Sequence, residues 1–325
     1  MSIKISYTSP LFSSIIYLLS LFRPVHANER YSVGVTYDYN EKARLGDNLI
    51  CYLHAKWVSY KYGIPLLYKP FPYSDAFTFD EVETRYSAQT NTEKILLEGS
   101  LSSIEKRHGF LKRNCTFVVP YFPESFGERE VYKNHSHFIY PYFKVEWRDE
   151  KFRAILKEML KPKKPIEVLT FPKDKLSIAI HVRMGGGFDR EGLGNDPLFL
   201  GKLPPEKFYL DALELLCKLR PTDELYFHIF TDDADPKRIA LLVEEHVKSL
   251  RSAPFTVGFR TKGNSHNQNI LEDMFSMLEF DCLIRPESNF SIIPSLLKDY
   301  EILIHPNVWY VKGDLKKINL KIVMN

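Results

Sequence analysis

The chain has 325 residues, 44% of them hydrophobic and 26% charged, so it can bury one large core or two medium ones and is not a disordered chain. Its formal net charge of +3 is nearly neutral for this length and gives no general footprint for nucleic-acid binding. None of the four cysteines forms a CxxC pair, which argues against a zinc ribbon or a thioredoxin-type motif. A disulfide stays open, although Cys217 and Cys282 lie in apolar segments typical of buried thiols.

The N-terminus has the plan of a secretory leader. Lys4 precedes the apolar run of residues 11–22, and Val25-His26-Ala27 resembles a small-residue cleavage site. Residues 1–27 are therefore predicted to be a signal peptide or a short anchor, and peripheral membrane association would arise there. A real leader places the protein in the lumen of the secretory pathway or at a membrane, and otherwise we expect it in the cytoplasm.

The first half, residues 28–165, opens with a βαβ pattern. A strand is expected over 31–36, a helix from Asn48 to about residue 62 with Asp47 as its cap, and a strand over 64–68. Arg44 and Asn48 flank the glycine-containing turn before the helix. They either bind a ligand at the helix N-terminus or merely cap the helix.

Fewer helices and strands can be predicted in the remainder of the first half. Residues 115–119 read as a strand, and residues 147–160 have the apolar spacing of an amphipathic helix. The basic, proline-rich segment 161–165 then ends the helix and is the expected linker. We therefore predict two domains, an N-terminal one over 28–165 and a C-terminal one over 166–325.

The second half alternates strands and helices regularly. Strands are expected over 176–183, 225–231, 255–259, 281–284 and 302–305, and helices from Pro204, from Pro236, over 270–278 and after Ser291. Such alternation predicts an α/β fold with a doubly wound parallel sheet. In such sheets ligands bind beyond the carboxyl ends of the strands.

Polar residues gather at three of these strand ends. The clusters are His181 with Arg183 before three glycines, Asp232 with Asp233, and Ser288, Asn289 and Ser291. Arginine donates two parallel hydrogen bonds to phosphate, and a helix N-terminus attracts anions. Because the clusters share one edge of the sheet, they predict a pocket for an anionic ligand such as a nucleotide.

The order of these motifs resembles that of a known enzyme superfamily. His181-Val182-Arg183, Phe230-Thr231-Asp232-Asp233 and Asn289-Phe290-Ser291 look like the three motifs of the α1,2-, α1,6- and protein O-fucosyltransferases. The segment Arg44-Leu45-Gly46-Asp47-Asn48 resembles that superfamily's N-terminal glycine-Asn turn. The resemblance implies a GT-B-like fold, in which two Rossmann-like domains face a cleft. The domain over 28–165 would then be the acceptor-side domain, and the domain over 166–325 the nucleotide-sugar-binding domain that holds GDP-fucose.

The resemblance also implies roles for individual residues. His181 and Asp233 would contact the guanosine part of the donor, and Arg183 would hold the β-phosphate and stabilise the leaving GDP. Ser291, with Ser288 beside it, would bind a phosphate oxygen. The activity implied is inverting transfer of fucose to a glycan or other hydroxyl acceptor, without a metal or another cofactor.

An acceptor hydroxyl also requires a general base. Asp189 and Glu191 lie in the loop after Arg183, and the α1,6 branch of the superfamily places a carboxylate at about the offset of Glu191 from the histidine. Glu191 is therefore the predicted base. The DxD-like Asp233-Ala234-Asp235 is discounted as a metal motif because Asp235 is better explained as the cap of the helix that begins at Pro236.

Three questions stay open at the level of sequence. The acceptor is a glycan, a lipid-linked sugar or a protein hydroxyl. A non-catalytic nucleotide-sugar or glycan-binding protein on the same scaffold would show the same motifs. An unrelated α/β enzyme acting on a phosphorylated metabolite is the third alternative.

Overall fold

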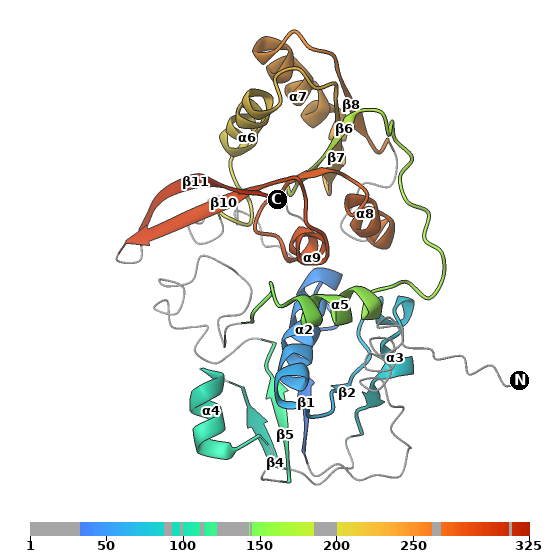
Figure 1. The fold of residues 1–325 in the computed structure, drawn as a ribbon, viewed down its shortest axis with the longest axis vertical. Coiled ribbons are helices and arrows are strands. Elements are labelled where there is room, and N and C mark those ends of the chain that lie inside the picture. Colours follow the sequence, from blue (N-terminus) through green and yellow to red (C-terminus); the bar gives the residue numbers. More distant parts are fainter. Residues whose placement is uncertain are drawn as a thin grey trace, which may run out of the picture.

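The computed structural model describes residues 33–87, 93–97, 100–110, 114–121, 143, 145–184, 200–261, 268–311 and 314–325. They form an N-terminal and a C-terminal α/β unit, drawn at the bottom and the top of Figure 1. The predicted leader over 1–27 and the predicted base Glu191 lie outside these residues. Within the described ranges, no helix combines the length and apolarity needed to cross a membrane.

The N-terminal unit is built on a small parallel sheet. Its elements are β1 (Val33–Tyr37), α2 (Leu45–Tyr62), β2 (Leu67–Tyr68), η1 (Ser74–Ala76), α3 (Phe79–Val82), β3 (Thr84–Arg85), β4 (Glu93–Leu96), α4 (Leu101–His108), β5 (Cys115–Val119) and α5 (Glu150–Met159). Strands β1, β5 and β4 are parallel, and a parallel bridge between Val35 and Leu66 joins β1 to the chain just before β2. The predicted βαβ unit is confirmed.

Helix α2 starts earlier than predicted. It begins at Leu45, with Arg44 as an N-cap that makes no side-chain capping bond, so the predicted capping role of Asp47 is wrong. Asp47 lies inside the first turn, and its carboxylate contacts the other unit instead. The end of the helix is as expected, because Gly63 adopts φ 64°, a left-handed conformation that glycine tolerates without strain.

The C-terminal unit contains a six-stranded sheet. Its elements are β6 (Leu176–Val182), α6 (Glu206–Leu219), β7 (Leu225–Thr231), α7 (Pro236–Leu250), β8 (Phe255–Phe259), α8 (Ile270–Met277), β9 (Cys282–Ile284), α9 (Asn289–Leu297), β10 (Ile302–Val311) and β11 (Asp314–Met324). The strand order is β11-β10-β9-β6-β7-β8, and every pair except β10–β11 is parallel. The direction of winding therefore reverses between β6 and β9, which makes this the switch point where such sheets bind ligands.

Helices cover both faces of this sheet, so the doubly wound prediction is confirmed. Ile178 and Ile180 of β6 pack with the helices α6 and α7 on one face, whereas Ala179 packs on the other face with Met277 of α8. The antiparallel strand β11 was not predicted, although Ile318, Leu320 and Ile322 alternate with polar residues as a strand requires. All four cysteines are buried.

Helix α9 joins the two units. Its side chains Ile292, Ile293 and Leu297 belong to the core of the N-terminal unit, where α9 lies against α2 (Figure 1). Burial of each such side chain contributes roughly 1.5–3 kcal/mol. The boundary between residues 165 and 166 stays a prediction, because a helix from beyond it completes the first core.

Candidate functional site

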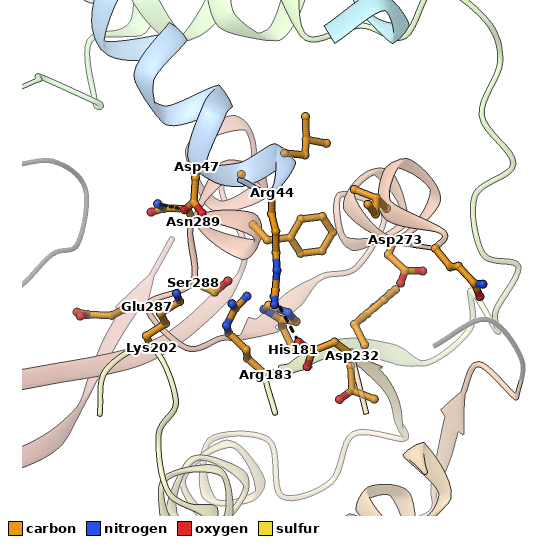
Figure 2. Close-up of a pocket in the computed structure, with 17 residues that line it drawn as sticks. Arg44, Asp47, His181, Arg183, Lys202, Asp232, Asp273, Glu287, Ser288 and Asn289 are labelled. Atoms are coloured by element: carbon orange, nitrogen blue, oxygen red, sulfur yellow. Dashed lines mark hydrogen bonds and ion pairs between the residues drawn. The ribbon is translucent and has the colours of Figure 1, made fainter. Parts of the chain in front are cut away.

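A pocket lies between the two units, at the switch point of the larger sheet. The carboxyl ends of β6 and β7 and the first turns of α2, α8 and α9 contribute to its wall. Figure 2 shows these side chains converging on one space from both units. The charged residues of the lining are Arg44, Asp47, Arg183, Lys202, Asp232, Asp273 and Glu287. The pocket therefore contains residues from all three strand-end clusters, as predicted.

Arg44 and Asp232 form an ion pair across the pocket. The Arg44 Nη1 atom lies 3.4 Å from Asp232 Oδ2, and Figure 2 shows Arg44 extending from the start of α2 toward the other unit. The other oxygen, Asp232 Oδ1, accepts the backbone N–H of Met184 at 2.7 Å. One carboxylate therefore fixes the backbone after β6 and holds a guanidinium from the facing unit.

His181 is a neutral imidazole at the floor of the pocket. Only 6% of its surface is exposed, and its pKa is lowered to about 3, first by burial and then by Arg183, Arg285 and Arg44. Its Nδ1 atom is buried and has no partner among the described residues. A neutral ring can donate from one nitrogen and accept at the other, so His181 can hydrogen-bond a polar ligand without adding charge.

Arg183 and the start of α9 make the anion-binding end. Arg183 is 8% exposed, lies directly after β6 and lines the pocket. Ser288, the N-cap of α9, and Asn289, its first residue, line the same wall. The first N–H groups of a helix lack partners within the helix and carry a partial positive charge. Together these groups suit a phosphate or diphosphate.

The first turns of α2 and α9 touch each other. Asn289 Nδ2 donates to Asp47 Oδ1 at 2.6 Å. A Cβ atom placed on Gly46 would lie 2.5 Å from the backbone nitrogen of Phe290 and 2.7 Å from the carbonyl carbon of Asn289. Only glycine allows this approach, so the fit of the two units at the pocket depends on Gly46.

Two of the predicted ligand residues serve the fold instead. Asn48 is fully buried, and its amide accepts the N–H of Asn40 and donates to the Asn40 carbonyl, each at 3.2 Å. Ser291 is also fully buried, and its hydroxyl donates to the Ser288 carbonyl at 3.4 Å. Neither residue is part of the pocket lining; the lining residues of these segments are Asp47 and Ser288.

Asp233 likewise points away from the pocket. Its Oδ1 atom accepts the N–H of Asp235 at 2.9 Å, and its Oδ2 atom lies 3.3 Å from Arg238 of α7. The neighbouring Asp232 lines the pocket in its place. The capping role predicted for Asp235 is confirmed, because its side chain accepts the N–H of Arg238.

Sequence reasoning missed several pocket residues, chief among them Asp273. Asp273 lies in the first turn of α8, and Arg260 Nη2 contacts its Oδ1 atom at 2.6 Å. Burial raises the pKa of this carboxyl, and Arg260 opposes that rise. The signal was an acidic residue early in a helix that follows a strand of the sheet, but the apolar spacing of residues 270–278 hid it. Lys202, Gln268 and Glu287 were also missed.

In the part of the chain that the structure describes, no group of three or more His, Cys, Asp or Glu side chains is placed to hold a metal ion. Metal independence stays a prediction.

Comparison of the sequence with family descriptions and with curated proteins gives no match. Solved structures give matches of low identity. An Arabidopsis thaliana FUT1 mutant in complex with GDP is 10% identical with a TM-score of 0.47, and the match covers 93% of this chain and 76% of that chain. POFUT1 in complex with GDP-fucose is 11% identical with a TM-score of 0.43, covering 84% and 96%.

The fucosyltransferase NodZ from Bradyrhizobium is 15% identical with a TM-score of 0.38, and the match covers 90% of this chain and 99% of that chain. These structures are like the present chain in fold alone. The roles of the pocket residues follow from the contacts described above.

Proposed function

We propose that the protein is an inverting glycosyltransferase that uses a nucleotide sugar, with GDP-fucose as the donor. The acceptor is the hydroxyl of a glycan, a lipid-linked sugar or a protein, and the reaction needs no metal. One observation carries the proposal: Arg44, Arg183 and the first turn of α9 line a single pocket between two α/β units. The choice of GDP-fucose rests on the motifs around His181, Asp232 and Asn289.

The basic end of the pocket suits the chemistry of the leaving group. In glycosyl transfer the bond between the anomeric carbon and the diphosphate breaks, and negative charge builds on the departing oxygen. Arg183, buried after β6, and the helix N-terminus at Ser288 are fixed before the substrate arrives. Removal of one such preorganised donor typically costs ~3 kcal/mol of transition-state stabilisation.

The acidic side of the pocket suits a guanine base. Asp273 lies on the other side of Arg44 from Ser288 and Lys202 in Figure 2. A carboxylate accepts two hydrogen bonds at once, and guanine offers adjacent N–H donors on its pairing edge. Arg260, which contacts Asp273, holds the carboxylate in place. In this proposal Asp273 takes the role that was predicted for Asp233.

The test combines binding and turnover. Calorimetry should detect GDP and GDP-fucose binding to the wild-type protein, and GDP release from GDP-fucose should be measurable. Arg183→Ala should lower turnover by about 100-fold, which corresponds to the loss of one preorganised donor. Arg238→Ala is the matched control, because Arg238 is half exposed and contacts Asp233 outside the pocket.

Three outcomes separate the alternatives. Failure of the wild-type protein to bind GDP, alongside binding of a small phosphate ester, would favour an enzyme of phosphorylated metabolites. Binding of GDP-fucose with no GDP release under any acceptor condition would favour a non-catalytic binding protein. Wild-type turnover in Arg183→Ala would contradict the role of Arg183 in the reaction.

A further inference from the structure

The proposed reaction needs a proton acceptor, and the pocket contains a carboxylate in a suitable place. We propose that Asp47 is the general base that takes the proton of the attacking hydroxyl. This inference rests on the proposed function. It replaces the sequence-based choice of Glu191, which lies outside the described residues.

Asp47 enters the pocket from the N-terminal unit, whereas the other pocket carboxylates belong to the C-terminal unit. Inversion requires the acceptor to attack from the side opposite the leaving diphosphate. In the proposed function Arg183 and Ser288 of the C-terminal unit hold the diphosphate, and a base from the facing unit would act on an acceptor that enters from that side. Asp47, in the first turn of α2, is the carboxylate that the described part of the N-terminal unit contributes to the pocket.

Two other pocket carboxylates already have cationic partners. Asp232 accepts from Arg44 and from the Met184 N–H, and Asp273 contacts Arg260 at 2.6 Å. A carboxylate engaged by a guanidinium is a poor proton acceptor, because the ion pair favours its charged form. Asp47 is instead held by a neutral amide.

The Asn289 amide orients the Asp47 carboxylate. Asn289 Nδ2 donates to Asp47 Oδ1 at 2.6 Å, which orients the carboxylate, and its second oxygen, Oδ2, is the proposed proton acceptor. Asn289 Oδ1 is buried and has no partner among the described residues, and Asn289 lines the pocket. Figure 2 shows Asp47 and Asn289 side by side at the wall where the units meet. The pair therefore resembles a base with the group that orients it.

Proton transfer to Asp47 accompanies attack of the acceptor on the donor. The acceptor oxygen forms a bond to the anomeric carbon of the sugar while its proton moves to Asp47 Oδ2. The bond from the anomeric carbon to the β-phosphate oxygen breaks, and its electron pair leaves with GDP. Arg183 stabilises the charge that develops there. When water replaces the acceptor, the same proton transfer gives hydrolysis of the donor.

The test needs no knowledge of the natural acceptor. GDP release from GDP-fucose is measured in water alone and with added sodium azide, for the wild-type protein and for Asp47→Asn. Azide is an anionic nucleophile that attacks the anomeric carbon without losing a proton, so it needs no base. Asp75→Asn is the matched control, because Asp75 is exposed in the 3-10 helix of the N-terminal unit and is not part of the pocket lining.

We expect Asp47→Asn to bind GDP like the wild-type protein, since an asparagine oxygen still accepts from Asn289. Its GDP release in water should fall by about 100- to 10,000-fold, the range for removal of a general base. Azide should restore release to within about tenfold of the wild-type rate and yield fucosyl azide. Asp75→Asn should behave like the wild-type protein throughout.

Two results would overturn the role of Asp47 while leaving the proposed function intact. One is hydrolysis by Asp47→Asn within about threefold of the wild-type rate. The other is intact GDP binding with no recovery in azide, which would make Asp47 a residue that only positions α9. Absence of any GDP release by the wild-type protein, in water and in azide, would overturn the proposed function and this inference with it.

Discussion

Replacement of Gly46 by alanine tests whether the joint between the two units controls the pocket. The added Cβ atom would lie 2.5 Å from the Phe290 nitrogen, 2.7 Å from the Asn289 carbonyl carbon and 2.8 Å from the Phe290 Cα. All three atoms belong to the backbone of the first turn of α9. No rotation of a side chain can relieve the contact, so α2 and α9 must move apart.

The expected loss of stability follows from two opposing effects. Overpacking of this kind costs about 1–3 kcal/mol. Alanine in place of glycine inside a helix contributes about 1 kcal/mol in the opposite direction. The backbone clash is the larger effect, and Gly46→Ala should lower the free energy of unfolding by up to about 2 kcal/mol.

Gly63→Ala is a matched control for stability. Gly63 ends the same helix with φ 64°, and nothing lies within 4 Å of the position of its added Cβ atom. Alanine in that conformation costs roughly 1–2 kcal/mol, so the two variants should lose similar stability in urea unfolding. They should differ in ligand binding, because only the substitution at Gly46 pushes Asp47 and Asn289 apart at the pocket.

Calorimetry with GDP measures that difference. A separation of the two first turns should weaken GDP binding to Gly46→Ala by about tenfold, or ~1.4 kcal/mol. Gly63→Ala should bind GDP like the wild-type protein. If Gly46→Ala keeps both wild-type stability and wild-type GDP affinity, then close approach of α2 and α9 does not shape the pocket, and the reasoning is refuted.

Two further predictions concern charge. Burial lowers the pKa values of His54, His181 and His228 from 6.5 to about 4, 3 and 3. Below about pH 6.5 the unfolded chain therefore binds more protons than the folded protein. The three neutral histidines contribute fully to stability above about pH 6.5, and the contribution is lost toward pH 3 by up to about 4 kcal/mol per pH unit. Urea unfolding should therefore give a lower free energy of unfolding at about pH 5 than at about pH 7, and equal values would contradict this. Asp273→Asn should reduce the preference for GDP over ADP by at least about tenfold in calorimetry, and an unchanged preference would remove Asp273 from base recognition.

The sequence predicted the strands of the larger sheet well because their burial leaves an unambiguous pattern. Residues 225–231 and 255–259 are the same in prediction and structure, and both are apolar runs bounded by polar or proline residues. Once the sheet is parallel, the carboxyl ends of neighbouring strands must share an edge. That rule alone was enough to predict that His181, Arg183 and Ser288 lie in one site.

The errors arose where one residue of register decides the outcome. Asp232 and Asp233 follow β7 directly, and adjacent residues of extended chain point in opposite directions. One therefore lines the pocket, and the other contacts Arg238 of α7. The sequence contains no signal for this choice, because both residues are aspartates in the same turn.

An error of three residues in the predicted start of α2 explains why the wrong residue of its first turn was assigned to the pocket. The helix was expected to begin at Asn48, which would place Asn48 at the exposed end. Because it begins at Leu45, Gly46 and Asp47 occupy that end and Asn48 is buried in the next turn. The close approach of Gly46 to Phe290 joins residues far apart in the chain, so local spacing in the sequence does not reveal it.

The distribution of charge in the pocket limits the ligands that suit it. Among the described lining residues, the cations are Arg44, Arg183 and Lys202, while four side chains are carboxylates. A small phosphate ester would satisfy the cations, but it offers few hydrogen-bond donors to the carboxylates. A nucleotide sugar also brings donors, on its base and its sugar hydroxyls, at the two ends of the diphosphate. Inorganic phosphate should therefore bind far more weakly than GDP, whereas equal affinity would favour an enzyme of phosphorylated metabolites.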